Sequence, residues 1–404
     1  WQYKAEGNAN VVLFYTGESP VLAGRTIRLS KVHAVAGKRG PVARQPPVST
    51  VFPADALTFA GTVVQPLLGD LHAIPGIEVP TTPAFLLAMQ ARIDAARPSH
   101  RKGLIDTAAP SLVVMYDQTM IPTVGGFVDL SQSFCLEIKP KWGLLPQPGA
   151  LPDDARSTTC RFCMHQRLKA SQGKVASHSR FCPLDLYSHE DARVQRGLRN
   201  LVATPQNNLR VFRDGVPVFT AESLPAGRES VEGYQAAMRT VLRGEPFYGD
   251  TPRFIRFMSA LLCWDGVLDQ VRGAQRLDTH GVHHVAAVFK RAMQGSGEPA
   301  GGDGSRLAAW LQSPMGAQAA SLLANFLVSA TLKDCSIMVA FKTVRRCGDA
   351  IGHIPSHVRY VDLADLTDDD APHGVLVSVA VVDIDPKSVW RIPAYAKLDA
   401  DIAD

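Results

Sequence analysis

The sequence Ser336-Ile-Met-Val-Ala-Phe-Lys342 and the later sequence Val375-Leu-Val-Ser-Val-Ala-Val-Val-Asp-Ile384 decide the fold class. Both runs are mostly apolar, rich in β-branched residues and of strand length, so each predicts a buried strand. They follow a long region of helical periodicity, and further strands are expected near the start of the chain. Strands, then a helix-rich body, then strands again predict an α+β protein with two lobes rather than a regular βαβ alternation.

The rest of the chain supplies the other elements of this pattern. A length of 404 residues is enough for two packed lobes. Runs of strand-forming residues predict further strands at 9–15, 21–29, 111–116, 134–138 and 209–212. Apolar residues at helical spacing predict helices at 84–96, 161–171, 190–202, 232–242 and 307–333.

The composition excludes several classes of protein. The chain has 42 Lys and Arg against 38 Asp and Glu, a formal net charge of +4. This surplus is too small for a histone-like nucleic-acid binder, but it is compatible with a local basic pocket. No apolar run reaches the roughly 18 residues of a membrane span. The seven cysteines are too few for a disulfide scaffold. Their distribution predicts a reducing, intracellular compartment, the cytoplasm or the nucleus or both.

Three cysteines lie close together in one segment. Cys160-x2-Cys163 is followed by His178-x3-Cys182. Two short-range pairs separated by a loop are typical of structural zinc, so these four residues are the predicted Zn²⁺ ligands. Three buried thiols without a metal would give the same sequence pattern. The alternatives for the fourth ligand are His165 and His189.

Glu137-Ile138-Lys139-Pro140-Lys141 places two cations at the end of a predicted strand. Alternate residues of a strand face the same side, so Lys139 and Lys141 are expected to point together. Two parallel lysines at a pocket suit an anion with several phosphates. A solvated strand end is the alternative interpretation.

Acidic residues adjoin both of the decisive strands. Asp334 precedes the first strand and Asp383 ends the second. A buried strand fixes the position of such an acid, which can then hold Mg²⁺ or accept a proton. Two acids of this kind are what phosphoryl transfer requires. Helix caps and surface acids are the commoner explanation.

Two further stretches carry polar groups suited to hydroxyls and phosphates. Thr204-Pro205-Gln206-Asn207-Asn208-Leu209-Arg210 combines paired amides with a guanidinium, although it also has ordinary turn chemistry. Lys387, Arg391 and Tyr395 are four residues apart and can share a helical face. Pro393 limits that helix to a turn or two.

Taken in order, these motifs resemble the inositol-pentakisphosphate 2-kinase family, and the likeness covers nearly the whole chain. The sequence departs from the pattern at His33, where some relatives have Arg. The motifs that carry the resemblance are Trp1-x-Tyr3-x-x-Glu6-Gly7-Asn8-Ala9-Asn10, Ile27-Arg28-Leu29, Gln65-Pro66-Leu67-Leu68-Gly69, Glu137-Ile138-Lys139-Pro140-Lys141, Met164-His165-Gln166-x-Leu168-Lys169, Cys182-Pro183-Leu184-Asp185-Leu186, Gln206-Asn207-Asn208, Lys333-Asp334-Cys335-Ser336-Ile337-Met338 and the stretch 383–399.

The resemblance implies a two-lobed, protein-kinase-like fold. The N-terminal lobe with the nucleotide loop and hinge would be residues 1–117. The C-terminal lobe would be residues 118–404, with a large inositol-phosphate-binding insertion at about 150–330. The implied activity is ATP-dependent phosphorylation of the 2-hydroxyl of inositol 1,3,4,5,6-pentakisphosphate to the hexakisphosphate, phytate. A non-catalytic inositol-polyphosphate-binding protein is the alternative.

The resemblance also implies roles for individual residues. Asp334 is similar to the catalytic aspartate, Asp383 to the Mg²⁺ ligand, and Arg28 to the phosphate-facing lysine of protein kinases. The remaining nucleotide-site residues would be Gly7, Asn8, Ala9, Asn10, Met115, Asp117, Glu137 and Lys139. The basic bowl for the substrate would comprise Arg101, Lys139, Lys141, His165, Lys169, Asn207, Asn208, Arg210, Lys387, Arg391 and Tyr395.

The charge of the substrate explains why the basic bowl would contain so many cations. Each phosphate carries about −1.5 to −2 charges, so five phosphates require a dense set of cations. An RNA-binding module could use the same cations, but the chain lacks the interleaved aromatic residues that stack on bases. We therefore expect ATP and inositol pentakisphosphate as partners, Mg²⁺ and structural Zn²⁺ as cofactors, a monomer, and no nucleic-acid or membrane partner.

Overall fold

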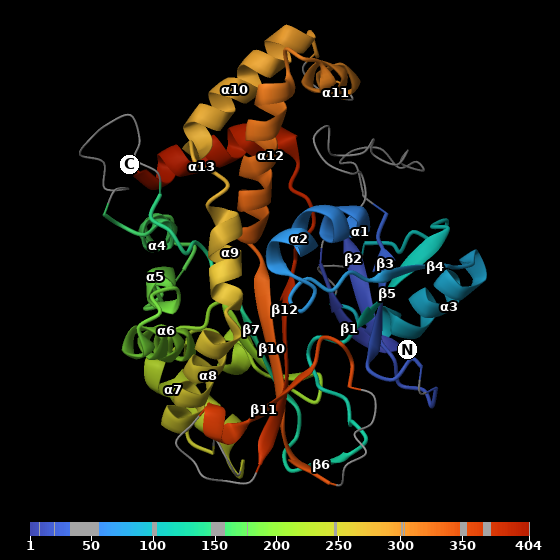
Figure 1. Cartoon of the computed structure of the whole chain (residues 1–404), viewed down its shortest axis with the longest axis vertical. Helices are drawn as coiled ribbons and strands as arrows, with labels where there is room; N and C mark the ends of the chain where they lie inside the picture. The colour runs from blue at the N-terminus through green and yellow to red at the C-terminus, as the bar shows by residue number, and fades with distance from the viewer. Residues whose placement is uncertain are drawn as a thin grey trace.

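The computed structural model describes residues 1–7, 9–19, 21–32, 56–98, 103–146, 158–175, 177–245, 249–299, 302, 304–347, 354–366 and 373–403. Within these residues, two antiparallel sheets and a large set of helices form a mixed architecture (Figure 1). The predicted α+β class is therefore confirmed. His33 lies outside the described residues.

The first sheet is built from the N-terminal part of the chain and has the order β1-β2-β3-β5-β4. Side chains alternate across it, as a pleated strand requires. Val11, Ile27 and Leu29 are buried together with residues of helix α3, whereas Arg28 and Ser30 lie on the opposite face. The elements are β1 (Gln2–Glu6), β2 (Asn10–Phe14), β3 (Arg25–Ser30), β4 (Ile77–Pro80), α3 (Pro83–Ile93) and β5 (Ser111–Tyr116).

The second sheet has seven strands, and the two decisive runs form its centre. They are β10 and β12, paired in register from Ser336↔Val382 to Val344↔Gly374. The predicted strand at 336–342 continues to Arg346, and the second strand ends one residue before Asp383. The order is β11 (Arg359–Asp362), β12 (Gly374–Val382), β10 (Ser336–Arg346), β7 (Phe134–Ile138), β8 (Leu209–Arg213) and β9 (Val216–Phe219), with β6 (Phe127–Asp129) beside β10.

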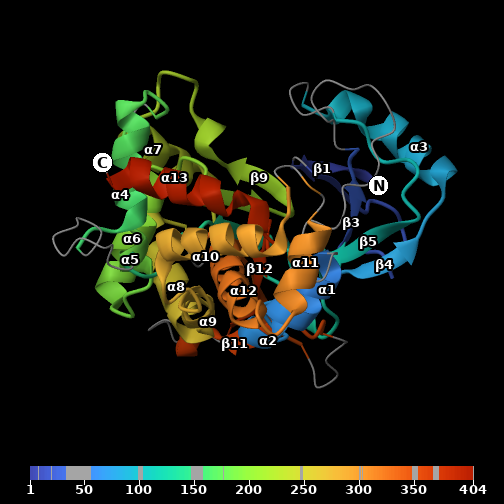
Figure 2. The same ribbon diagram turned by 90° about the horizontal axis from the view of Figure 1, so that it is seen from above.

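Helices pack against the second sheet and extend beyond it. One group lies on its flank, whereas α10 to α13 form a separate apolar cluster at one end of the molecule (Figure 1). Seen from above, α13 runs beside α10 and α4 (Figure 2). The flanking helices are α4 (Arg161–Ser171), α5 (Pro183–Leu186), α6 (Asp191–Ala203), α7 (Val231–Leu242), α8 (Thr251–Asp265) and α9 (Val267–Gln275). The end cluster contains α10 (Gly281–Ser296), α11 (Ser305–Gln312), α12 (Ala317–Leu332) and α13 (Ile392–Ala403).

One predicted helix is interrupted. The single helix expected at 307–333 is two helices, α11 and α12, separated at residues 313–316. Ser313 is extended, with ψ 158°, because the following Pro314 disfavours helical geometry at the preceding residue. No single helix in the described part of the chain is long and apolar enough to cross a membrane, although the bent pair α11 and α12 passes that test by length and composition.

A helical segment from the N-terminal part of the sequence packs on the core of the second sheet. It comprises α1 (Ala56–Phe59), a π-helical turn (Ala60–Val64) and α2 (Gln65–Leu68). Phe59, Val64 and Leu68 belong to the same buried cluster as residues of β7, β10 and β12. The N–H of Val381 also donates to the carbonyl of His72, at 2.7 Å. The strands of the first sheet precede the predicted boundary at residue 117, and those of the second sheet follow it. The helical segment precedes residue 117 in the sequence but packs on the second sheet.

Candidate functional site

The register of the second sheet brings three predicted site residues to one end of it. Ile138 of β7 faces Ile337 of β10, and Ser336 faces Val382 of β12. Because the strands are antiparallel, the residues just after β7, just before β10 and just after β12 emerge at the same end. Lys139, Asp334 and Asp383 occupy these three places.

Asp334 lies between two cations. Its carboxylate is 3.0 Å from Lys387 Nζ and 3.6 Å from Lys141 Nζ. Burial opposes its ionisation, but the charges of Lys387 and Lys141 outweigh that effect and lower the pKa of Asp334. Asp334 is therefore a carboxylate at neutral pH.

The hydroxyl of Ser336 is the centre of the neighbouring polar cluster. Lys139 Nζ donates to it at 3.0 Å, and it lies 3.1 Å from Glu137 Oε1 and 3.3 Å from Asp383 Oδ2. Its single hydrogen can serve only one of the two carboxylates at a time. Sequence analysis assigned no role to Ser336. The residue stands in the motif around Asp334, but its partners come from other strands.

Asp383 has unusual backbone geometry. Its φ is +60°, in the left-handed region that non-glycine residues seldom adopt. Such strain persists only where the surrounding structure maintains it, and it is common at functional sites. Lys139 Nζ lies 3.3 Å from the carboxylate, which is 63% exposed and thus available to a ligand.

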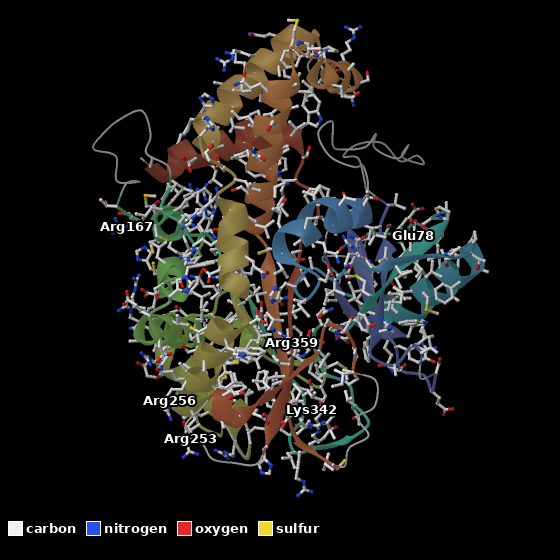
Figure 3. All side chains as sticks on the ribbon, in the orientation of Figure 1. Glu78, Arg167, Arg253, Arg256, Lys342 and Arg359 are labelled. Atoms are coloured by element: carbon white, nitrogen blue, oxygen red, sulfur yellow. The ribbon has the colours of Figure 1, made fainter. Side chains whose placement is uncertain are left out.

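Beside Asp334 lies a cavity of about 320 Å³, which we call the cationic cavity. Helix α4 contributes residues from one face to it, while Arg167 lies on the outer side of the same helix (Figure 3). The basic residues on its wall are Lys141, Arg161, His165, Lys169, Lys333 and Lys387. Its other lining residues are Trp142, Phe162, Asn207, Asn208, Val282, Phe326, Ala330, Asp334, Tyr395, Leu398 and Asp399.

Burial and neighbouring cations lower the pKa values of four of these basic residues. Burial and then the charges of Lys169 and Arg161 lower the pKa of His165 to about 4. Burial is also the largest cause of the lowered pKa values of Lys141, Lys169 and Lys333, and nearby cations add to it. Like charges held this close are costly unless an anion compensates them. The cavity is therefore suited to a multiply charged anion.

Asn208 gives an independent indication of a ligand. Its side chain is buried and lies on the wall of the cationic cavity. Neither the oxygen nor the nitrogen of its amide has a hydrogen-bond partner among the described residues. An unpaired buried amide costs free energy, and a polar ligand would remove that cost. Asn207 is exposed on the same wall.

Trp142 is a site residue that sequence analysis missed. Lys333 Nζ lies 4.1 Å and the guanidinium carbon of Arg161 lies 4.8 Å from the centre of its ring. Ion pairs hold both cations, Lys333 with Asp278 at 3.0 Å and Arg161 with Asp399 at 2.9 Å. The only sequence feature that could have indicated Trp142 is its position directly after Lys141, which was a predicted site residue.

Several predicted substrate residues lie away from the cavity wall. Arg210 is 3.4 Å from Glu137, its partner across β7 and β8. Arg391 stacks on Tyr395 at 5.9 Å. Arg101 and Asn8 lie outside the described residues. The structure therefore brings Lys141, His165, Lys169, Asn207, Asn208, Lys387 and Tyr395 together on this wall.

A second cavity, of about 270 Å³, lies between the two sheets. We call it the intersheet cavity. Arg28 and Asp383 supply a charged end, whereas Leu112, Val113 and Val381 give apolar walls that suit a flat ring. Of the residues predicted for nucleotide binding, Asn10, Arg28, Met115 and Asp383 line it.

The other predicted nucleotide residues have different surroundings. Gly7 N–H donates to the carbonyl of Asn10 at 2.9 Å, and the carbonyl of Ala9 accepts from Lys31 N–H. Asp117 is buried and accepts from Lys4 Nζ at 2.7 Å. Thr119 also donates to Asp117, so this carboxylate is engaged away from the intersheet cavity.

The three clustered cysteines are brought together. The sulfur atoms of Cys160, Cys163 and Cys182 all lie within 4.8 Å of one another, and no histidine joins this group among the described residues. Cys160 and Cys182 each precede the first turn of a helix. Hydrogen bonds from Cys160 and Cys163 lower the pKa of the Cys182 thiol. His178 is exposed.

Comparison with known proteins shows that the chain is similar to one family of kinases. A family model described as inositol-pentakisphosphate 2-kinase matches residues 3–401. The inositol-pentakisphosphate 2-kinase of Arabidopsis thaliana is 28% identical over 437 residues, covering 100% of this chain and 92% of the relative. A relative of the same description from Oryza sativa subsp. indica is 26% identical, with the same coverage. One from Danio rerio is 31% identical over 55% of this chain and 44% of the relative.

Proposed function

Because the chain belongs to the inositol-pentakisphosphate 2-kinase family and is thus a kinase, we propose that it transfers the γ-phosphate of ATP to the 2-hydroxyl of inositol 1,3,4,5,6-pentakisphosphate. The product is the hexakisphosphate. One observation carries this proposal: the cationic cavity contains Asp334, the intersheet cavity contains Asp383, and both acids emerge at the same end of the second sheet. A donor and an acceptor can therefore meet between them.

The acceptor side is the cationic cavity. The substrate brings roughly −7.5 to −10 charges, at roughly −1.5 to −2 for each of its five phosphates. Lys141, Lys169 and Lys387 supply point charges for these phosphates, and the unpaired amide of Asn208 supplies both a donor and an acceptor. Binding would add negative charge beside Lys141 and Lys169, which favours their protonated forms.

Asp334 acts on the attacking hydroxyl. It is ionised, so it accepts the hydroxyl hydrogen bond and orients the oxygen toward the donor. Its lowered pKa makes it a weak base, which suits a reaction in which positioning matters more than early deprotonation. Lys141 and Lys387 hold the carboxylate in place.

The donor side is the intersheet cavity. The apolar walls accept the adenine ring, and Asn10 and Arg28 face the phosphates. Asp383, with Ser336 and Lys139 beside it, is placed to hold Mg²⁺. When bound, Mg²⁺ neutralises charge that develops on the transferred phosphoryl group. Separate cavities for the donor and the acceptor support a two-lobed, protein-kinase-like fold. In this fold, residues at about 150–330 form the substrate-binding insertion.

We also assign structural Zn²⁺ to Cys160, Cys163 and Cys182. The three close sulfur atoms and the lowered pKa of the Cys182 thiol support three of the four ligands of a structural zinc site. His178 remains the predicted fourth ligand. The metal would join α4 to α5, and because α4 carries His165 and Lys169, it would act on substrate binding through the helix.

The cellular setting follows from the same chemistry. All seven cysteines are free thiols in the structure, which supports a reducing, intracellular location in the cytoplasm or the nucleus. ATP and the inositol phosphate are small, soluble substrates that require no nucleic-acid or membrane partner, and the chain supplies both cavities itself. A monomer is the proposed functional unit.

The test is a transfer assay with the purified chain, Mg²⁺, γ-labelled ATP and inositol 1,3,4,5,6-pentakisphosphate. The expected product carries the label in inositol hexakisphosphate at the 2-position, identified by chromatography and NMR. Asp334→Asn serves as the inactive reference. Label transfer to another hydroxyl, or hydrolysis of ATP without transfer, would refute the assignment.

A further inference from the structure

Arg28 and Asp385 form an ion pair across the intersheet cavity. Nη1 of Arg28 donates to Asp385 Oδ1 at 3.2 Å, and Nη2 donates to Oδ2, so the contact is bidentate. Arg28 comes from β3 of the first sheet, and Asp385 follows β12 of the second sheet. The pair therefore ties the two walls of the intersheet cavity together.

Asn10 holds the guanidinium from a second side. With its amide oxygen oriented toward Arg28, that oxygen accepts from Nε at 2.9 Å and from Nη2 at 2.6 Å. A guanidinium has five N–H donors. Asn10 and Asp385 engage four of them, and one N–H of Nη1 remains for a ligand among the described contacts. The plane of the guanidinium is thus set before a nucleotide binds.

In protein kinases, the phosphate-binding lysine of the corresponding strand is held by a glutamate from a nearby helix. The helical segment that borders the intersheet cavity here contributes Ala56, Leu57 and Ala60 to its wall. Its sequence, Ala-Leu-Thr-Phe-Ala-Gly-Thr-Val-Val-Gln-Pro-Leu-Leu at 56–68, contains no acidic residue. The carboxylate that pairs with Arg28 comes from Asp385 instead.

We propose that Asp385 is the positioning residue for Arg28 and couples it to the metal-binding acid Asp383. This inference rests on the proposed function and deepens it. Only Ile384 separates the two acids, and the strained backbone at Asp383 sets the direction of the segment that follows. Because Asp383 and Asp385 lie in one short segment, Mg²⁺ held by Asp383 would also fix the position of the carboxylate that holds Arg28.

The test is a titration of Asp385→Asn with Mg·ATP and no inositol phosphate, followed by steady-state kinetics. Asp385 is 50% exposed, so this isosteric change should leave the thermal stability unchanged. The Kd and the KM for Mg·ATP should rise about tenfold, because a charge-assisted bidentate contact is lost. The KM for the pentakisphosphate should stay within about twofold, since Asp385 does not line the cationic cavity. Asp385→Glu should restore most of the nucleotide affinity.

Asp401→Asn is the matched control, because it removes the same charge from an exposed pair with Lys397. A double variant, Arg28→Met with Asp385→Asn, should bind Mg·ATP no more weakly than Arg28→Met alone. Unchanged or tighter binding by Asp385→Asn, or additive losses in the double variant, would overturn the proposal. Tighter binding would mean that the nucleotide has to break the ion pair between Arg28 and Asp385 in order to bind. Failure of wild-type transfer to the pentakisphosphate would refute the proposed function separately, because the titration contains no acceptor.

Discussion

Lys387 Nζ lies 3.0 Å from Asp334 Oδ2, although 53 residues separate them in the chain. Lys387 lies between β12 and α13, and Asp334 lies just before β10. The segment that leads into α13 thus provides the main cation beside Asp334, which lies at the start of β10. Lys387 also lines the cationic cavity, so one ammonium contacts the acid and faces the acceptor.

Asp334→Asn should abolish phosphoryl transfer while leaving the fold intact. The carboxylate is 60% exposed, and the amide keeps its shape but cannot accept the hydroxyl proton. We expect kcat to fall about 10²- to 10⁴-fold, with the KM values for both substrates little changed. Steady-state kinetics and a thermal melt check this. Turnover within threefold of wild type would remove Asp334 from the mechanism.

Lys387→Met should change the pH dependence of the reaction. Lys387 is the largest of the charges that lower the pKa of Asp334. Its removal should raise that pKa and move the acidic limb of the kcat profile to higher pH, because Asp334 must be ionised to act. Lys397→Met, which removes an exposed ammonium from α13, should leave the limb in place. An unmoved limb in Lys387→Met would contradict the charge assignment.

Asp383→Ala should weaken Mg²⁺-dependent nucleotide binding. Loss of the carboxylate leaves the metal charge less neutralised and removes the acceptor near Ser336 and Lys139. The measurement is a calorimetric titration of ATP with and without Mg²⁺, in which only the Mg²⁺-dependent part should be lost. Equal Mg·ATP affinity and rate in wild type and variant would show that the metal is held elsewhere.

Asn208→Ala should weaken substrate binding without lowering the thermal stability of the free protein. The variant removes a buried side-chain amide that has no hydrogen-bond partner among the described residues, so the free protein should be as stable as wild type or more stable. The KM for the pentakisphosphate should nevertheless rise about tenfold through the lost hydrogen bonds. Melting curves with and without the inositol phosphate check both parts. A less stable free protein with unchanged KM would make Asn208 a structural residue.

Purified protein should contain one zinc per chain. Cys163→Ser should lose the metal, lower the thermal stability and raise the KM for the pentakisphosphate more than that for ATP, because α4 carries His165 and Lys169. Metal analysis under chelator-free conditions decides the first step, and clearly less than one zinc would refute the site. One zinc in His178→Ala with unchanged melting would transfer the fourth position to His165 or His189.

Elements with strong local signals could be predicted from the amino-acid sequence. The apolar runs that became β10 and β12, and the helical spacing of α4, depend on neighbouring residues, so they were predicted without tertiary information. The spacing also predicted that Cys160 and Cys163 lie close together, because Cys160 caps the helical turn that contains Cys163. The break between α11 and α12 could also have been predicted, because Pro314 disfavours helical geometry at the residue before it.

Which of the polar groups lie in contact depends on the packing of the sheets and helices. Strand register places the Ser336 hydroxyl near Asp383. Packing around the cationic cavity leaves the side-chain amide of Asn208 buried, with no hydrogen-bond partner in the part of the chain that the structure describes. The pairing of Arg28 with Asp385 spans 357 residues. Such contacts depend on how separate sheets and helices pack, and local propensity carries no information about distance between segments far apart in the chain.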